Sequence, residues 1–121
     1  MGKTVLIAED EPHIVEALSY VLDREGYRVE AVGDGMQALE QLISAPPDMA
    51  ILDVMLPNLS GLDILRRLRD HSRLAGLPVL MLTAKVQKRD REEAEQAGAT
   101  EFMTKPFDNS EVVDTVRRLI G

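Results

Sequence analysis

Short apolar runs that end in polar residues recur along this chain and constrain its fold more than any other feature. The runs and the polar residues that follow them are Val5–Ala8 with Glu9, Met49–Leu52 with Asp53, and Val79–Leu82 with Thr83. Continuously apolar strands are typical of a parallel sheet that helices cover on both faces. The carboxyl ends of such strands form the edge where open α/β sheets bind ligands. We therefore expect the polar groups to gather at one edge.

Five strand-like segments alternate with five helix-like segments. The expected strands are Thr4–Ala8, Arg28–Val32, Met49–Leu52, Val79–Leu82 and Glu101–Thr104. The expected helices are Pro12–Glu25, a helix capped by Asp34 that ends near Ile43, Leu62–His71, Lys88–Ala97 and Asn109–Ile120. These units predict an α/β fold, a single doubly wound (βα)5 sandwich over residues 1–121 with a flavodoxin-like parallel sheet in order 2-1-3-4-5. In that order Asp10 and Asp53 face each other where the strand order reverses.

In all the expected helices except Lys88–Ala97, which is highly charged, apolar residues recur at helical spacing and are expected to face the sheet. In the second helix these residues are Ala38, Leu39, Leu42 and Ile43.

The composition excludes several classes of function. Hydrophobic residues make up 45% of the 121 residues and charged residues 29%, which is typical of one globular domain. The 14 basic and 21 acidic residues give a net charge of −7, which repels nucleic acid. We expect no membrane span, since no uncharged apolar segment is long enough. The lack of cysteine excludes disulfides and thiolate metal sites, and it fits a reducing compartment.

Carboxylates that gather at one edge need a compensating cation, because like charges oppose each other's ionisation. No His or Cys is placed to supply a soft ligand, so the expected cation is hard, and Mg²⁺ suits carboxylates and a phosphate. The Lys105 ammonium and the Thr83 hydroxyl can each hold a phosphoryl oxygen. A remaining carboxylate can act as a nucleophile and form an acyl phosphate. The edge is thus a candidate site for phosphoryl transfer.

The ordered set of motifs resembles the receiver domain of bacterial two-component response regulators. Its elements are Glu9-Asp10 after the first strand, Asp53 within Leu52–Pro57, Thr83-Ala84 after the fourth strand, and Lys105 within Thr104–Phe107. Any one fragment is weak evidence, whereas the set at these spacings covers essentially the whole chain.

The resemblance implies a role for each of these residues. Asp53 would accept a phosphoryl group from a histidine kinase or a histidine phosphotransfer protein. The implied Mg²⁺ ligands are Asp10, Asp53, the carbonyl of Met55, and Glu9 through water. Lys105, in a cis bond to Pro106, would hold the phosphoryl group with the Thr83 hydroxyl and the Ala84 amide. Such a regulator catalyses its own phosphorylation and dephosphorylation.

The resemblance also implies a switch, an output surface and a setting. Phe102 stands at the position of an aromatic rotameric switch, and the surface formed by the fourth helix, fifth strand and fifth helix would meet an output domain, a downstream protein or a second copy. The expected location is the cytoplasm. Arg91 and Glu111 suit an ion pair found in dimers of winged-helix regulators, but Ala97, Thr100 and Thr115 replace other charges of that network. The subfamily therefore stays open, as does whether the receiver is part of a longer protein.

The residues two positions after Asp53 and Thr83 tune phosphoryl lifetime in the family. Here they are Met55 and Lys85, which offer no obvious acid or amide to orient a water molecule. We therefore expect a long-lived phosphoryl group.

Other interpretations remain open at this stage. Taken alone, Asp53 suits a turn, Thr83 an N-cap, and Lys105 a structural ion pair with the acids. A haloacid-dehalogenase-type phosphatase also uses an aspartyl nucleophile, but it needs an acid where Met55 stands and the chain has no cap insertion. A flavodoxin-like flavin protein needs a phosphate loop after the first strand, where this chain is acidic, and ring-stacking aromatics, of which there is no Trp.

Overall fold

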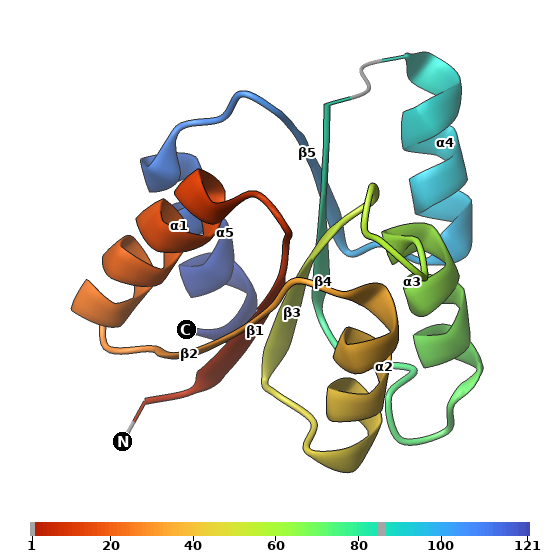
Figure 1. The fold of residues 1–121 in the computed structure, drawn as a ribbon, viewed down its shortest axis with the longest axis horizontal. Helices are drawn as coiled ribbons and strands as arrows, with labels where there is room; N and C mark the ends of the chain where they lie inside the picture. Colours follow the sequence, from red (N-terminus) through yellow and green to blue (C-terminus); the bar gives the residue numbers. More distant parts are fainter. Residues whose placement is uncertain (1, 85–86) are drawn as a thin grey trace.

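The computed structural model describes residues 2–84 and 87–121 and confirms the predicted α/β sandwich (Figure 1). The strands are β1 (Thr4–Ala8), β2 (Arg28–Val32), β3 (Met49–Asp53), β4 (Val79–Thr83) and β5 (Glu101–Thr104). The helices are α1 (Pro12–Arg24), α2 (Gly35–Ser44), α3 (Gly61–Asp70), α4 (Lys88–Ala97) and α5 (Asn109–Ile120). Strand and helix therefore alternate five times along the chain, as the sequence predicts.

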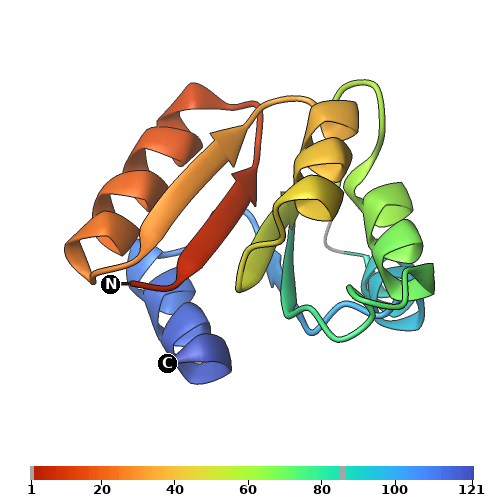
Figure 2. The same ribbon diagram turned by 90° about the horizontal axis from the view of Figure 1, so that it is seen from below.

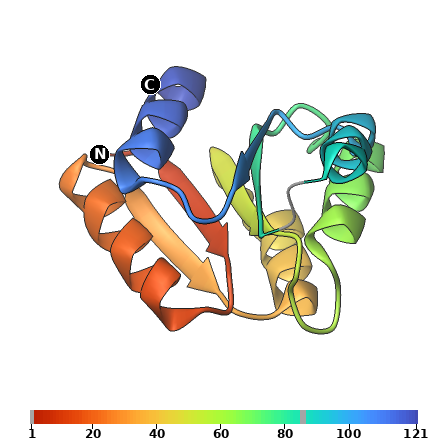
Figure 3. The same cartoon turned by 90° about the horizontal axis from the view of Figure 1, so that it is seen from above.

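The five strands form one parallel sheet in the predicted order β2-β1-β3-β4-β5. Helices α1 and α5 lie on one face of this sheet, and α2, α3 and α4 lie on the other (Figures 2 and 3). The register pairs Ala8 with Leu52 and Asp53 with Leu82. The carboxyl ends of β1, β3 and β4 consequently lie side by side, and the residues that follow them share one edge.

The apolar runs are continuous because both faces of the central strands are buried. Along β1, Leu6 and Ala8 belong to the core beneath α2 and α3, whereas Val5 and Ile7 belong to the core beneath α1 and α5. All four side chains are fully buried. Strand β2 differs, since it lies at the edge of the sheet and its residues alternate in polarity.

The element boundaries differ from the sequence expectation at a few positions. Asp53 and Thr83 are the last residues of β3 and β4, where the sequence places them just after the strands. The α1 helix ends at Arg24, one residue earlier than expected. Ile43, expected to face the sheet, is 37% exposed because it lies in the last turn of α2, beyond the buried Leu39 and Leu42. The carboxylate and hydroxyl are thus held by strand backbone at the edge.

The loop after β3 returns the chain closely against that strand. The Gly61 N–H, at the start of α3, donates a hydrogen bond to the Val54 carbonyl over 3.0 Å. A Cβ atom at Gly61 would lie 2.2 Å from the carbonyl oxygen of Asp53, so a side chain does not fit there. Asn58 in the same loop donates a hydrogen bond to Asp34, the N-cap of α2. This loop therefore fixes the backbone that carries Asp53.

Substitution of Gly61 by alanine tests this packing. Because the new methyl group would overlap the Asp53 carbonyl, we expect Gly61→Ala to lower the free energy of unfolding by about 1–3 kcal/mol, the usual cost of overpacking. Gly76→Ala is the matched control, since nothing lies within 4 Å of its added Cβ and the backbone there is not left-handed. Urea unfolding followed by circular dichroism measures both values; equal free energies for the two variants would contradict the close packing at Gly61.

Candidate phosphoryl-acceptor site

Three carboxylates meet at the predicted edge of the sheet. Glu9 and Asp10 follow β1, and Asp53 ends the neighbouring β3. One carboxylate oxygen from each lies within 4.8 Å of the others. Glu9 and Asp53 are buried, whereas Asp10 is exposed. The cluster is therefore open to solvent on the Asp10 side and closed by protein on the others.

The Lys105 ammonium supplies the positive charge at the centre of this cluster. Its Nζ lies 2.9 Å from Glu9 Oε1 and 3.3 Å from Asp53 Oδ2. A third carboxylate, that of Glu11, lies 3.2 Å from the same nitrogen. The Lys105 side chain is 12% exposed, so water screens these ion pairs weakly. Four carboxylates and one ammonium leave the site with a net negative charge.

The Glu9 carboxylate lacks part of the solvation that an ionised group needs. Its Oε2 accepts a hydrogen bond from the Glu11 backbone N–H over 3.1 Å. Its Oε1 is buried and has no aligned hydrogen-bond partner within the described chain, even though the ammonium is close. Burial therefore raises the pKa of the Glu9 carboxyl, and neither the ammonium nor the N–H offsets it fully. The site holds this charge at a cost.

The same contacts have the opposite effect on the ammonium. Burial alone would lower the pKa of Lys105, because desolvation disfavours its charged form. The nearby carboxylates of Glu9, Asp53 and Glu11 outweigh that effect and raise the pKa above its usual value. Lys105 therefore stays charged throughout the physiological range.

The cluster fits a hard divalent cation. All its free ligand atoms are carboxylate oxygens, the type that Mg²⁺ and Ca²⁺ prefer. A cation would relieve the excess of negative charge and would supply a further partner for the buried Glu9 oxygen, which has an ion pair but no aligned hydrogen bond. Two or three carboxylates with one side open to water match the way Mg²⁺ binds, since it retains several waters.

Three other residues predicted for the site, Thr83, Ala84 and Met55, lie at or just after the ends of β3 and β4. Thr83 is buried at the end of β4, and its carbonyl accepts a hydrogen bond from the Lys105 N–H over 2.7 Å. Ala84, the next residue, is exposed. The Met55 side chain is 61% exposed, and its N–H donates to Asp53 Oδ1 over 3.2 Å. Both oxygens of Asp53 are thus engaged, one by a backbone amide and one by the ammonium.

Phe102 lies apart from the carboxylates. It pairs with Met81 across β4 and β5, is partly buried, and carries the Arg91 guanidinium over its ring at 5.1 Å from the centroid. The Lys105-Pro106 bond is cis, as the resemblance implies. Lys85, predicted to tune phosphoryl lifetime, lies outside the described residues.

Sequence patterns did not single out two residues that shape the site. Glu11 lies just before α1, yet its carboxylate pairs with Lys105, which comes from the opposite end of the chain. The Ser60-Gly61 pair is typical of a turn, yet Gly61 packs against the Asp53 carbonyl. Only the meeting of β1, β3 and β5 in space gives these residues their role, and no local pattern records it.

A pocket of about 490 Å³ lies directly beside the cluster. Its lining residues are Glu11, His13, Ile14, Ala17, Ala84, Lys105, Pro106, Phe107 and Asn109. The pocket is mainly apolar, and Lys105 and Glu11 connect it to the carboxylates. A bulky group could therefore approach the acceptor carboxylate over the first turn of α1.

Comparison with known proteins agrees with the geometry. The chain is 44% identical to the probable transcriptional regulatory protein TcrX of Mycobacterium tuberculosis over 117 residues. This aligned segment covers 97% of this chain and 49% of TcrX. The chain thus spans about half the length of the curated relatives it matches.

Solved structures show the same fold. Chemotaxis protein CheY4 of Vibrio cholerae is 31% identical with a TM-score of 0.90, over 98% of this chain and 99% of that one. The receiver domain of sensor histidine kinase PA1611 from Pseudomonas aeruginosa is 34% identical with a TM-score of 0.86, over 100% and 99% of the two chains. That structure has a magnesium ion in its active-site cleft. The family model described as the response regulator receiver domain matches residues 5–117, and the chain belongs to this family.

Proposed function

We propose that residues 1–121 act as one receiver domain, in which Asp53 accepts a phosphoryl group from a phosphohistidine. The observation that carries this proposal is the state of the Asp53 carboxylate. It is buried at the sheet edge, oriented by the Met55 N–H and paired with Lys105, while Glu9 and Asp10 add an excess of negative charge beside it. A carboxylate held in this way is positioned as a nucleophile.

Transfer forms one bond and breaks one. A carboxylate oxygen of Asp53 attacks phosphorus, the bond from phosphorus to the donor imidazole nitrogen breaks, and its electron pair stays on that nitrogen. The Lys105 ammonium compensates the negative charge on the moving phosphoryl oxygens. We assign the Thr83 hydroxyl and the Ala84 N–H, at the end of β4, to hold the same oxygens after transfer.

Glu9, Asp10, Asp53 and the Met55 carbonyl are the residues that would hold Mg²⁺, with Glu9 acting through water. When bound, Mg²⁺ neutralises the carboxylates and the phosphoryl oxygens so that two anionic groups can approach. The exposed Asp10 lies on the side from which a hydrated cation can enter. The relative with magnesium in its cleft supports this assignment.

The proposed donor is a sensor histidine kinase or a histidine phosphotransfer protein of the cytoplasm. The apolar pocket beside Lys105 is where its phosphorylated imidazole would approach Asp53. Phosphorylation would then shift an existing equilibrium through the contacts of Thr83 and Phe102, and so alter the surface of α4, β5 and α5. An output domain, a downstream protein or a second copy would read that surface.

The charged pair proposed for a dimer is already engaged within one chain. The Arg91 guanidinium lies over Phe102, and the Glu111 carboxylate accepts a hydrogen bond from the Asp108 N–H in the capping box of α5. Pairing of Arg91 with Glu111 of another copy would have to replace both contacts. We therefore expect dimerisation, where it occurs, to depend on phosphorylation.

Phosphoryl transfer from a small donor tests the proposal directly. Incubation with Mg²⁺ and acetyl phosphate should add one phosphoryl group, detected by intact-mass spectrometry. EDTA should prevent the addition, and so should Asp53→Asn, because the amide is not a nucleophile of this kind. Asp23→Asn, which alters an exposed carboxylate on α1, should leave it unchanged. An adduct that still forms on Asp53→Asn would contradict the assignment. So would a wild-type protein that forms no adduct with either acetyl phosphate or a phosphorylated kinase.

The electrostatics of Glu9 predict a pH dependence of metal-free stability. Above pH 4.5, the ordinary value for this carboxyl, the unfolded chain releases a proton that the folded chain retains. Folding then binds a proton, so the free energy of unfolding falls as pH rises toward the raised pKa. We expect Glu9→Gln to remove this decline in EDTA, and Mg²⁺ at neutral pH to stabilise the wild type more than the variant.

Urea unfolding across the pH range measures this dependence. The control is Glu16→Gln, which changes an exposed glutamate of α1 and should keep the wild-type slope. Identical slopes for Glu9→Gln and the wild type would show that burial of Glu9 does not disfavour its ionised form.

The exposed Met55 side chain predicts a slow loss of the phosphoryl group. A thioether cannot accept a proton from an attacking water, so general-base assistance is missing at this position. After the donor is removed by desalting, the adduct should persist for minutes or longer, and Met55→Glu should shorten its lifetime. Loss from the wild type within seconds would disprove this expectation.

A further inference from the structure

The α4 helix has little internal reason to hold its position. Of its ten residues, all of which the structure describes, only Ala94 is buried. Gln87 at its N-cap makes no side-chain capping bond within the described chain. Lys88 and Arg89 begin the helix, Asp90 is the acidic residue of its first turn, and no basic residue lies in its last turn, so these charges give the helix dipole no net support. The position of α4 therefore depends on its contacts with other parts of the chain.

The C-terminal end of α4 is held by a side chain of α3. Arg69, in the last turn of α3, donates its Nε–H to the Gly98 carbonyl over 2.9 Å. One terminal nitrogen donates to the carbonyls of Leu77 over 2.8 Å and Ala75 over 3.2 Å. The other reaches the Thr100 hydroxyl over 3.4 Å. One guanidinium thus joins the end of α4 to the loop before β4 and to the residue before β5.

The residues around Arg69 supply hydrogen-bond acceptors and space for its guanidinium. No carboxylate in the described part of the chain forms an ion pair with it, so its partners are backbone carbonyls and a hydroxyl. Gly98 has φ of +101°, closes α4 in the left-handed conformation, and leaves no room for a side chain, since a Cβ there would lie 2.9 Å from Arg69 Cγ. Thr100 Oγ1 also accepts a hydrogen bond from the Val79 N–H over 3.0 Å. The anchor therefore continues into β4.

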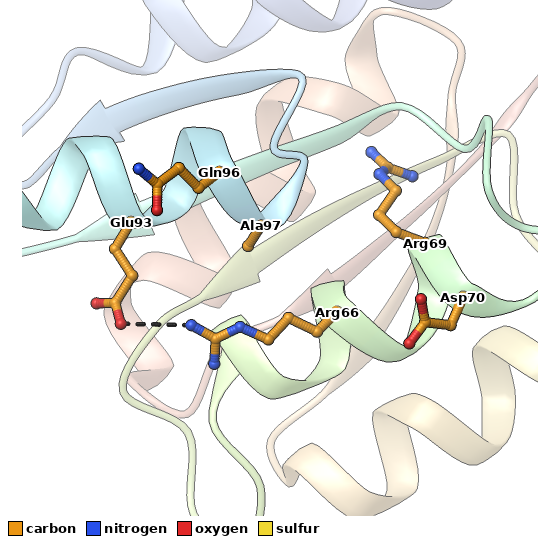
Figure 4. A pocket seen from close by; sticks show the side chains of 6 residues that line it. All are labelled: Arg66, Arg69, Asp70, Glu93, Gln96 and Ala97. Carbon is orange, nitrogen blue, oxygen red and sulfur yellow. Dashed lines mark hydrogen bonds and ion pairs between the residues drawn. The ribbon is translucent and has the colours of Figure 1, made fainter.

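The first two turns of α4 are attached more weakly. Arg66 of α3 pairs with Glu93 over 3.3 Å, and both side chains are about half exposed. Arg91 lies over Phe102 at 5.1 Å. Exposed ion pairs and exposed cation–π contacts each contribute little to stability. Figure 4 shows the Arg66–Glu93 pair and Arg69 at different parts of the α3–α4 pocket, whose volume is about 520 Å³.

We infer that Arg69 anchors the C-terminal end of α4, so that α4 pivots about this end and its first turn moves most. A ten-residue helix is about 15 Å long, so a small rotation displaces the first turn by several ångströms. The first turn is the end that follows Thr83 and Ala84 in the chain. The regulatory meaning of the pivot rests on the proposed function, because Thr83 and Ala84 are the residues assigned to hold the phosphoryl group.

Amide hydrogen exchange tests the pivot without phosphorylation. In EDTA and without phosphodonor, we expect wild-type amides in the first half of α4 to exchange faster than those of its last turn, Gly98 and Ala99. Arg69→Lys keeps the charge but loses the planar fork. It should speed exchange of the last turn about tenfold or more and remove the gradient along α4. Arg67→Lys, an exposed neighbour on α3, is the control and should exchange like the wild type.

Three results would overturn the inference. One is equal protection of the amides along wild-type α4. This result would overturn the inference whether or not Arg69→Lys folds. Another is exchange in Arg69→Lys that matches Arg67→Lys. The third is an equal loss of protection in β1, β3 and α4, which would give Arg69 a general role in stability instead. Because no phosphoryl group is involved, failure of Asp53 phosphorylation leaves this measurement unaffected.

Discussion

The position of one ammonium group among the carboxylates governs the rest of the site. Lys105 arrives at the end of β5, crosses to the ends of β1 and β3, and meets Glu9, Glu11 and Asp53 at 2.9–3.3 Å. Without it, buried like charges would oppose folding. With it, the charges remain unbalanced, since one cation faces four acids. Such an imbalance accommodates a divalent cation, and only with that cation bound would the site suit an anionic phosphoryl group.

The fold was predictable from the sequence because its strongest signals are local. An apolar run such as Val79–Leu82 can be buried on both faces only inside a parallel sheet, and the alternation with amphipathic helices leaves few topologies. The same runs located Asp53 and Thr83 to within one residue of their places, as the last residues of their strands. The carboxylate cluster followed from strand order, which brings Asp10 and Asp53 to neighbouring strands.

Residues with long-range roles were not predictable in this way. Arg69 reads as a charged residue on the exposed side of an amphipathic helix, yet its head group donates hydrogen bonds to the carbonyls of Leu77 and Gly98 and to the Thr100 hydroxyl. Gly61 reads as a turn residue, and its close approach to Asp53 depends on the path of the loop. Neither role leaves a spacing pattern. Each needs the positions of atoms that are distant in sequence, which only the folded chain supplies.

Helix α4 is held against the rest of the molecule by different means from α1 and α5, and this difference bears on the proposed function. Helices α1 and α5 pack on the sheet through large apolar side chains such as Leu18, Leu22 and Val116. The α4 helix buries one alanine and is held by arginines. The exposed Arg66–Glu93 ion pair and the Arg91–Phe102 contact can be exchanged at little cost in stability, whereas an apolar core cannot. If Asp53 accepts a phosphoryl group as proposed, we expect the change at that site to displace the first turns of α4 more readily than α1.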